Sequence, residues 1–226
     1  MRQSVSVHAI SPAVVLRGEA AWVEAGPRIA ALCSRPLVLG RSSATDQLRQ
    51  ALVLDLQGLG LHPKQARLQF DCCEQDLSRI TVEATGCDAV LAAGGGKALD
   101  AGKLLAHRLG LPCITVPLSA ATCAGWTALA NLYSPEGAFQ CDVVLDRCPD
   151  LLVFDHGLVR QAPSRTLASG VADALAKWYE ASVSSGDSGD GLVQQAVQMA
   201  RVLRDQLLID SSTALENPDS AAWVRT

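Results

Sequence analysis

Residues 88–103 read DAVLAAGGGKALDAGK, an apolar run that ends in three consecutive glycines and continues into a helical pattern. Because Gly94, Gly95 and Gly96 lack Cβ atoms, the backbone can turn sharply there and an anion can approach its amides. A helix that begins at such a turn offers unpaired N–H groups and the positive end of its dipole, which favour a phosphate or pyrophosphate. The segment therefore predicts a strand, a phosphate-binding turn and a helix that carries Lys97.

The spacing of the glycines excludes the two commonest phosphate loops. A Walker loop needs glycine where Leu91 stands, and the usual dinucleotide fingerprint needs a third glycine or alanine where Leu99 stands. An ordinary tight turn between a strand and a helix remains as the alternative to a phosphate site.

Short apolar runs alternate with amphipathic helical patterns along the first two thirds of the chain. The expected strands span residues 13–16, 36–39, 67–70, 89–93, 113–116 and 151–154, and the expected helices span residues 20–32, 45–56, 75–84 and 97–109. This alternation is typical of βαβ units in a parallel sheet. Segments 128–133 and 139–145, joined by Ser-Pro-Glu-Gly, predict a β-hairpin.

The pattern becomes helical after Pro163. Apolar residues at three- and four-residue spacing predict helices over 163–182 and 192–208, joined by a glycine- and serine-rich link. We therefore expect a chain of the α/β class in two parts. A Rossmann-like parallel-sheet domain covers residues 1–158, and the beginning of an all-helical domain covers residues 159–226.

Composition limits the classes of partner. The 226 residues are 49% hydrophobic and 19% charged, with a formal net charge of −4, and they contain no run of Lys and Arg interleaved with aromatic residues. This charge balance predicts no nucleic-acid partner. Prolines and glycines interrupt the uncharged stretch 109–135 and make it a poor transmembrane helix, so no membrane partner is expected.

The cysteine pattern bears on the compartment. The eight cysteines contain no Cys-x-x-Cys pair, which disfavours a zinc ribbon, and their density is below that of a disulfide scaffold. The N-terminal segment has no continuous apolar stretch, which argues against a secretory signal. These observations predict a cytoplasmic protein with reduced thiols.

Five blocks of sequence carry a resemblance to a known family. They are GGGKALDAGK at 94–103, LPCITVP at 111–117, TALANLYSPEGAF at 127–139, DLLVFD at 150–155 and APSRTLASGVADALAKWYEA at 162–181. In order and spacing they resemble the iron-containing alcohol dehydrogenase superfamily, in particular its glycerol dehydrogenase-like branch. The resemblance implies a dehydroquinate synthase-like architecture, with a cofactor domain followed by an all-helical domain.

The resemblance also implies a nicotinamide cofactor, NAD or NADP. In the family the glycine turn binds the pyrophosphate of the cofactor, and the loop at 117–125 closes over the cofactor. The implied contacts are Gly94, Gly95, Gly96, Lys97, Pro117, Leu118, Thr122, Thr127, Leu129 and Tyr133, with Gly40 and Arg41 at the end of an earlier strand.

The residues after Gly40 bear on the choice between the two cofactors. Family members that prefer NAD tend to have an acidic residue near this position, where it bonds the ribose hydroxyls. Here Gly40 is followed by Arg41, Ser42 and Ser43. Without the acidic group a 2′-phosphate meets no repulsion, and Arg41 could attract it. The hypothesis is tolerance of or preference for NADP, and an ordinary solvated cation is the alternative role of Arg41.

In an apolar helical pattern, Asp173 matches the family's aspartate ligand of the catalytic metal, zinc or iron. In the family, two histidines from later helices complete that site. The four histidines of this chain, at positions 8, 62, 107 and 156, all precede Asp173. We therefore expect the chain to be truncated relative to the family and unable to hold its metal, because catalytic zinc typically has three protein ligands. An ion pair with Lys177 is the alternative role of Asp173.

Four further residues receive expected roles. Cys123 stands where glycerol dehydrogenases carry an aspartate implicated in substrate contact, and the thiol is expected to be buried and inert. Asp100 and Lys103 predict a surface ion pair, which the resemblance suggests also steadies the cofactor loop. His156 is expected to be a solvated loop residue.

Together these observations predict an NAD(P)- and metal-dependent oxidoreductase that transfers hydride between a nicotinamide and a small alcohol or polyol. A dehydroquinate synthase-type lyase and a non-catalytic, truncated nucleotide-binding remnant remain as alternatives. The expected partner is a small-molecule alcohol, and association into a homo-oligomer stays open.

Overall fold

The computed structural model describes residues 7–226, which form two compact units. The first unit comprises residues 7–118 and 123–157, and the second comprises residues 119–122 and 158–226. Most of the predicted cofactor contacts therefore belong to the first unit, whereas Thr122 and Asp173 belong to the second.

The first unit is built on a six-stranded parallel sheet, which confirms the predicted α/β class. In spatial order the strands are β1 (Val14–Gly18), β8 (Leu151–Asp155), β5 (Cys113–Pro117), β4 (Ala89–Gly94), β2 (Pro36–Gly40) and β3 (Lys64–Arg67). Every residue of β2, β4 and β5 is buried. Such continuously buried runs, apolar here except for Thr115 of β5, are expected in central strands that helices cover on both faces.

The edge strand β3 ends three residues earlier than the sequence predicts. Only Ala66 of its four residues is buried, so its apolar pattern is weak. Beyond it, the backbone N–H groups of Gln69 and Phe70 donate to the Asp76 carboxylate at 2.8 and 2.7 Å. These bonds satisfy the backbone outside the sheet, and the strand stops there.

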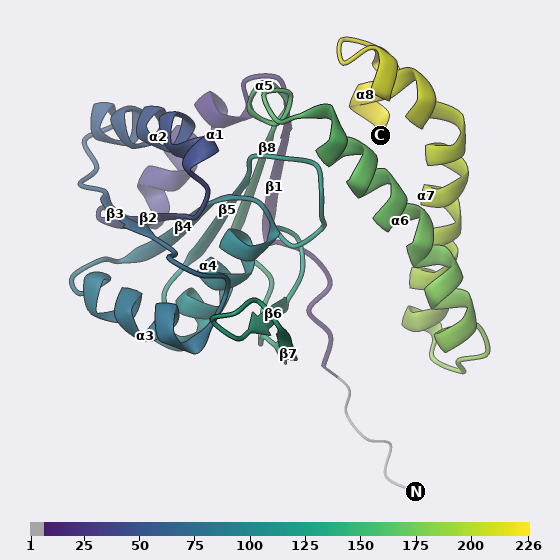
Figure 1. Ribbon diagram of the computed structural model, residues 1–226, viewed down its shortest axis with the longest axis horizontal. Coiled ribbons are helices and arrows are strands. Elements are labelled where there is room, and N and C mark those ends of the chain that lie inside the picture. The colour runs from purple at the N-terminus through teal and green to yellow at the C-terminus, as the bar shows by residue number, and fades with distance from the viewer. Residues whose placement is uncertain (1–6) are drawn as a thin grey trace, which may run out of the picture. The chain divides into compact units, whose positions relative to one another are not determined.

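Helices cover both faces of this sheet (Figure 1). One face carries α1 (Ala21–Leu32) and α2 (Asp46–Gly58), the latter preceded by a single 3₁₀ turn, and the other carries α3 (Glu74–Glu83) and α4 (Gly96–Leu109). The predicted hairpin is confirmed as β6 (Leu129–Tyr133) and β7 (Phe139–Val144), and β6 packs against α4.

The second unit is helical. After the short α5 (His156–Val159), the helices are α6 (Ser164–Ser185), α7 (Gly191–Glu216) and α8 (Ala221–Arg225), and α6 lies beside α7 (Figure 1). The side chain of Asp190 caps α7 by accepting from the Leu192 and Val193 amides. This helix extends past the predicted residue 208 to Glu216, because neither glycine nor proline occurs before Pro218.

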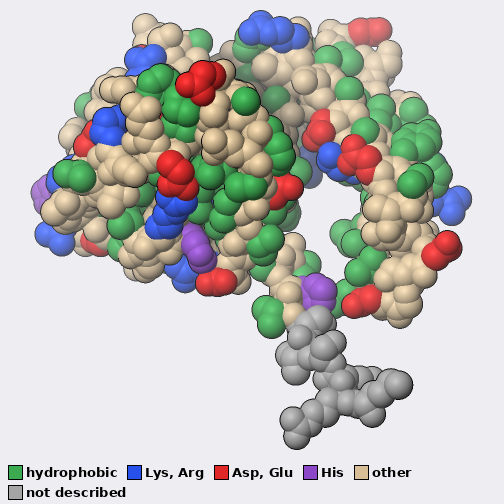
Figure 2. Space-filling model, turned by 60° about the horizontal axis from the view of Figure 1, so that its bottom comes forward, with side chains coloured by type: hydrophobic (Ala, Val, Ile, Leu, Met, Phe, Trp, Pro, Cys, Tyr) green, Lys and Arg blue, Asp and Glu red, His purple; other side chains and the backbone are tan. Residues whose placement is uncertain are grey.

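Two further observations concern the charged surface and the character of the helices. On the face shown in Figure 2, acidic and basic side chains are interspersed over the first unit. No helix within residues 7–226 has the length and apolar character needed to cross a membrane.

Candidate functional site

The three-glycine turn connects β4 to α4. Gly94 ends the strand, and Gly95 occupies the N-cap position with φ −87° and ψ −176° and without a side-chain cap. None of the three glycines has positive φ. The expected sharp turn therefore needs no backbone conformation that is special to glycine. What the missing side chain of Gly94 provides is space, because a Cβ on that residue would lie 2.9 Å from the Ala98 Cβ.

This turn lies where the strand order reverses. β2 and β4 are neighbours, but the chain leaves β2 toward β3 on one side and leaves β4 toward β5 on the other. The carboxyl ends of strands at such a switch point are where open α/β sheets bind ligands. The predicted contacts Gly40 and Gly94 end these two strands, and Gly94 pairs in register with Pro117 of β5.

A buried carboxylate joins the two cations at this end of the sheet. Asp71, whose side chain is 6% exposed, makes ion pairs with Arg41, at 2.8 Å, and with Lys97. Lys97 also lies 5.1 Å from the ring centroid of Tyr133, another predicted cofactor contact. The structure therefore brings Arg41, Lys97 and Tyr133 together around one acid, and Arg41 is an ion-paired residue as well as a partly solvated one.

A second buried cation supports Thr127, just before the hairpin, and Leu129, the first residue of the hairpin. The Lys103 ammonium donates to the backbone oxygens of Thr127 and Leu129 and to the Thr127 hydroxyl, and it lies 3.0 Å from a carboxylate oxygen of Asp100. The prediction of a surface ion pair is wrong, because the two side chains are 1% and 10% exposed. Burial raises the pKa of Asp100, and the neighbouring Lys103 lowers it in part.

The loop after β5 is divided between the two units. Pro117 ends β5, and the buried Leu118 donates its N–H to the Gly94 oxygen at 3.0 Å, so both lie beside the glycine turn. Thr122 belongs to the second unit. The expectation that Cys123 is buried is wrong, because its side chain is exposed and therefore accessible to reagents.

Asp173 lies on α6 in a more solvated setting than its apolar sequence neighbours suggest. Its side chain is 45% exposed and makes an ion pair with Lys177 at 3.3 Å, which is the alternative role predicted for it. Among residues 7–226, no three His, Cys, Asp or Glu side chains gather closely enough to hold a metal ion. The residues present therefore do not fit a catalytic metal site.

Asp71 and His156 show what sequence reasoning missed. Asp71 is not among the predicted site residues, because its partners Lys97 and Arg41 lie 26 and 30 positions away in the sequence. His156 was expected to be solvated, but it is 3% exposed and packs edge-on to the Phe154 ring. The residue directly follows the buried strand β8, and this position is the signal that could have predicted its burial.

Comparisons with known proteins agree with this geometry. Residues 12–156 match the family model described as iron-containing alcohol dehydrogenase. An uncharacterised oxidoreductase of Synechocystis is 48% identical over 95% of this chain and 56% of its own length, and a glycerol dehydrogenase of Escherichia coli is 31% identical over 91% and 58%.

A solved structure shares the fold. The crystal structure of a probable glycerol dehydrogenase from Sinorhizobium meliloti superposes with a TM-score of 0.86 and 26% identity, covering 97% of this chain and 63% of that protein. The chain thus spans somewhat more than half the length of each of these three proteins. With the parallel sheet, the switch-point glycine turn and the family match taken together, the chain belongs to the iron-containing alcohol dehydrogenase family.

Proposed function

We propose that this chain binds NAD(P)(H) at the glycine turn, as the cofactor-binding part of an oxidoreductase that acts on a small alcohol or polyol. The turn itself carries the proposal. It ends a buried strand at the switch point of the sheet, it opens a helix without a side-chain cap, and Lys97 stands in its first turn. Uncapped amides, a helix dipole and a lysine together suit a diphosphate.

The surrounding residues have separate tasks in this proposal. The first amides of α4 and the Lys97 ammonium hold the diphosphate, while Lys103 fixes the backbone of Thr127 and Leu129 along the same helix. When bound, the nicotinamide supplies the chemistry of accepting or returning a hydride. Protein groups contribute position and charge complementarity.

The names of the relatives support the substrate class. Besides glycerol dehydrogenases, they include a glycolaldehyde reductase of Halobacterium salinarum, 30% identical over 81% of this chain. Both names describe small compounds that carry neighbouring oxygen functions. The eight unpaired cysteines further support a reducing compartment such as the cytoplasm.

The number of available metal ligands limits what this proposal includes. Asp173 offers one carboxylate, and residues 7–226 form no cluster that completes it. This ligand count favours the reading in which the chain by itself binds the cofactor without turning it over.

Calorimetric titration of the purified chain with NAD⁺ and with NADP⁺ tests the proposal. We expect saturable binding of at least one coenzyme, and at least a tenfold loss of affinity in Lys97→Gln, since a hydrogen bond to a charged group is worth about 1.5–3 kcal/mol. Lys64→Gln, an exposed lysine of the same unit, is the matched control. Absence of binding by both coenzymes, or equal binding by Lys97→Gln, would refute the proposal.

A further inference from the structure

Asp71 is anchored in the loop between β3 and α3. On one side of it, the backbone oxygen of Phe70 accepts a hydrogen bond from the Arg41 Nε at 2.6 Å. On the other side, the backbone oxygen of Cys72 accepts from the Tyr133 N–H at 2.8 Å. Because the residues on both sides are held by these hydrogen bonds, the Asp71 carboxylate has a fixed place at this end of the sheet.

The Lys97 side chain has more room to move than its acidic partner. It is 43% exposed, whereas the Asp71 side chain is 6% exposed. A lysine ammonium is a compact charge at the end of a flexible four-carbon stem. Lys97 can therefore exchange one anionic partner for another while the carboxylate stays in place.

Two anions compete for this ammonium under the proposed function. Lys97 is the second residue of α4, beside the uncapped amides to which we assign the diphosphate. The same ammonium makes an ion pair with Asp71 and lies 5.1 Å from the ring centroid of Tyr133. Each hydrogen bond that Lys97 donates to the carboxylate is one that it does not donate to a phosphate oxygen.

Arg41 makes this exchange of partners energetically feasible. The two oxygens of the Asp71 carboxylate have different partners, because Oδ1 pairs with Arg41 at 2.8 Å and Oδ2 pairs with Lys97. A buried carboxylate that loses its last cationic partner is strongly destabilising. When Lys97 turns away, Arg41 remains beside Asp71, so the buried charge keeps a counter-ion.

We propose that Asp71 is a positioning residue that competes with the coenzyme diphosphate for the Lys97 ammonium and thereby lowers the affinity of the chain for dinucleotides. The inference rests on the proposed function, because it takes the glycine turn as the diphosphate site. An acid that only supported Lys97 would have the opposite effect. Removal of the carboxylate should therefore strengthen coenzyme binding.

Calorimetric titration of the whole chain and of Asp71→Asn tests this assignment. Asparagine keeps the size of the side chain and removes its charge. We expect Asp71→Asn to bind NAD⁺ and ADP-ribose about tenfold more tightly, since a charge-assisted contact no longer has to be exchanged. Adenosine, which has no diphosphate, should compete with NAD⁺ with an affinity that changes by less than about twofold. A salt concentration of about 0.15 M screens charge effects that reach beyond about 8 Å.

A double-mutant cycle identifies the cation through which Asp71 acts. In a Lys97→Gln background, Asp71→Asn should change NAD⁺ affinity by less than about twofold, because the ammonium for which the two anions compete is gone. In an Arg41→Gln background, most of the gain should remain. A gain that persists without Lys97, or that disappears only without Arg41, overturns the inference.

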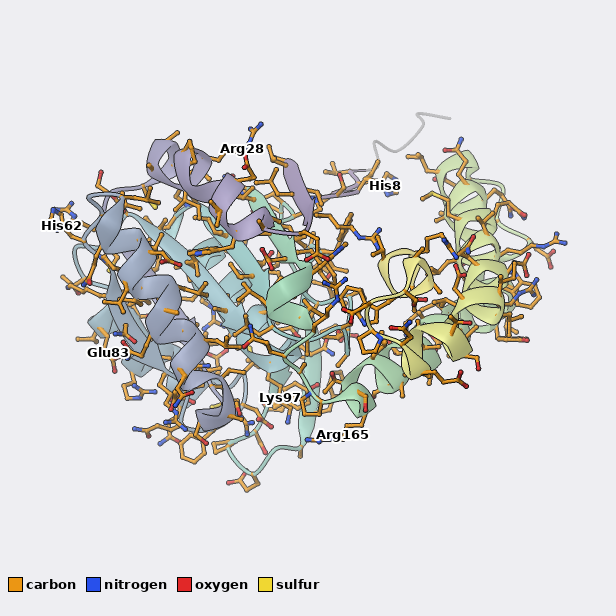
Figure 3. The ribbon with its side chains drawn as sticks, turned by 90° about the horizontal axis from the view of Figure 1, so that it is seen from above. His8, Arg28, His62, Glu83, Lys97 and Arg165 are labelled. Carbon is orange, nitrogen blue, oxygen red and sulfur yellow. The ribbon has the colours of Figure 1, made fainter. Side chains whose placement is uncertain are left out.

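Glu24→Gln is the matched control for the loss of one acidic charge. Glu24 is an exposed residue in the first turn of α1. It lies one turn before Arg28, which Figure 3 shows well apart from Lys97 within the first unit. The change should alter NAD⁺ affinity by less than about twofold. A tenfold gain in Glu24→Gln as well would reveal a general charge effect and overturn the inference.

The outcomes distinguish this inference from the proposed function. Saturable NAD⁺ binding that is unchanged or weaker in Asp71→Asn, with an unchanged circular dichroism spectrum, overturns the inference and leaves the glycine turn as the diphosphate site. If that spectrum shows an unfolded variant, Asp71→Ser, which also removes the carboxylate, gives the same comparison. If neither the parent chain nor any variant binds NAD⁺, the proposed function fails and the inference fails with it.

Discussion

Replacing Lys103 by methionine should weaken the first unit severely and release Thr127 and the start of β6. The ammonium donates to the backbone oxygens of Thr127 and Leu129 and to the Thr127 hydroxyl. It also forms an ion pair with Asp100. Methionine fills a similar volume and restores none of these contacts. The change therefore removes the Lys103 donor from one buried carboxylate and two backbone oxygens.

The size of the effect follows from these contacts. Hydrogen bonds to a charged donor contribute about 1.5–3 kcal/mol each, so three would sum to more than 4 kcal/mol. The saved cost of burying the ammonium offsets part of this sum. Removing one partner of a buried ion pair costs about 3–5 kcal/mol in comparable cases, which is the loss we expect. Such a loss is a large share of the about 5–15 kcal/mol that stabilises a typical domain.

The loss should depend on pH. Burial already raises the pKa of Asp100 above its ordinary 3.8, and without Lys103 it rises further. A carboxyl group with a raised pKa in the folded state binds a proton more readily there than in the unfolded chain. The penalty in Lys103→Met is therefore complete above the folded-state pKa and shrinks as the pH falls through it.

Denaturant unfolding followed by circular dichroism, at about pH 7 and about pH 5, measures both effects. Hydrogen exchange of residues 127–133 reports the local release. Lys64→Met, an exposed lysine of the same unit, should stay within about 0.5–1 kcal/mol of the parent chain. A loss below about 1 kcal/mol in Lys103→Met, or exchange that is unchanged at 127–133, would refute the reasoning.

Three other predictions concern packing and thiols. Gly102→Ala should destabilise the chain by about 1–3 kcal/mol in denaturant unfolding, because the new Cβ would overlap the Ala92 Cβ of β4, whereas Gly58→Ala, which meets open space, should be neutral or stabilising by up to about 1 kcal/mol. Alkylation mapped by mass spectrometry should modify the exposed Cys123 well before Cys113, whose pKa burial raises to about 12; equal rates would contradict the burial. Because such a thiol has an ordinary pKa of 9.0 when unfolded, stability should be fully present below pH 9.0 and decline as the pH rises toward 12, and a melting temperature that is constant over this range would count against it.

Local patterns were sufficient to predict the elements that position the site. The strands β2, β4 and β5 are runs of five or six residues that are apolar except for Thr115 of β5, and a run of that kind has few alternatives to a central strand. The glycine turn directly follows one of these runs, β4. Predicting that strand therefore also predicted that the turn lies at the carboxyl edge of the sheet. The hairpin was predictable from its Pro- and Gly-containing turn for the same local reason.

The side-chain environments could not be predicted in this way. Asp100 and Lys103 are three positions apart on a helix, and this spacing is the same for exposed and buried pairs. The backbone oxygens that Lys103 contacts are more than twenty residues away in the chain, so the helix pattern alone does not reveal them. The ion pairs of Asp71 and the position of Arg67 depend on the order of the strands. That order places β3 and β4 on either side of β2. No window of sequence contains that information.

The ion pairs of Asp71 have a consequence for selectivity. This single carboxylate already pairs with both Arg41 and Lys97, so an incoming anion competes with it for each cation. A small monovalent anion carries no more charge than the carboxylate with which it competes. Under the proposed function, a dinucleotide that reaches both cations at once would gain from each, and the site would then discriminate by the distance between charges as well as by their sign.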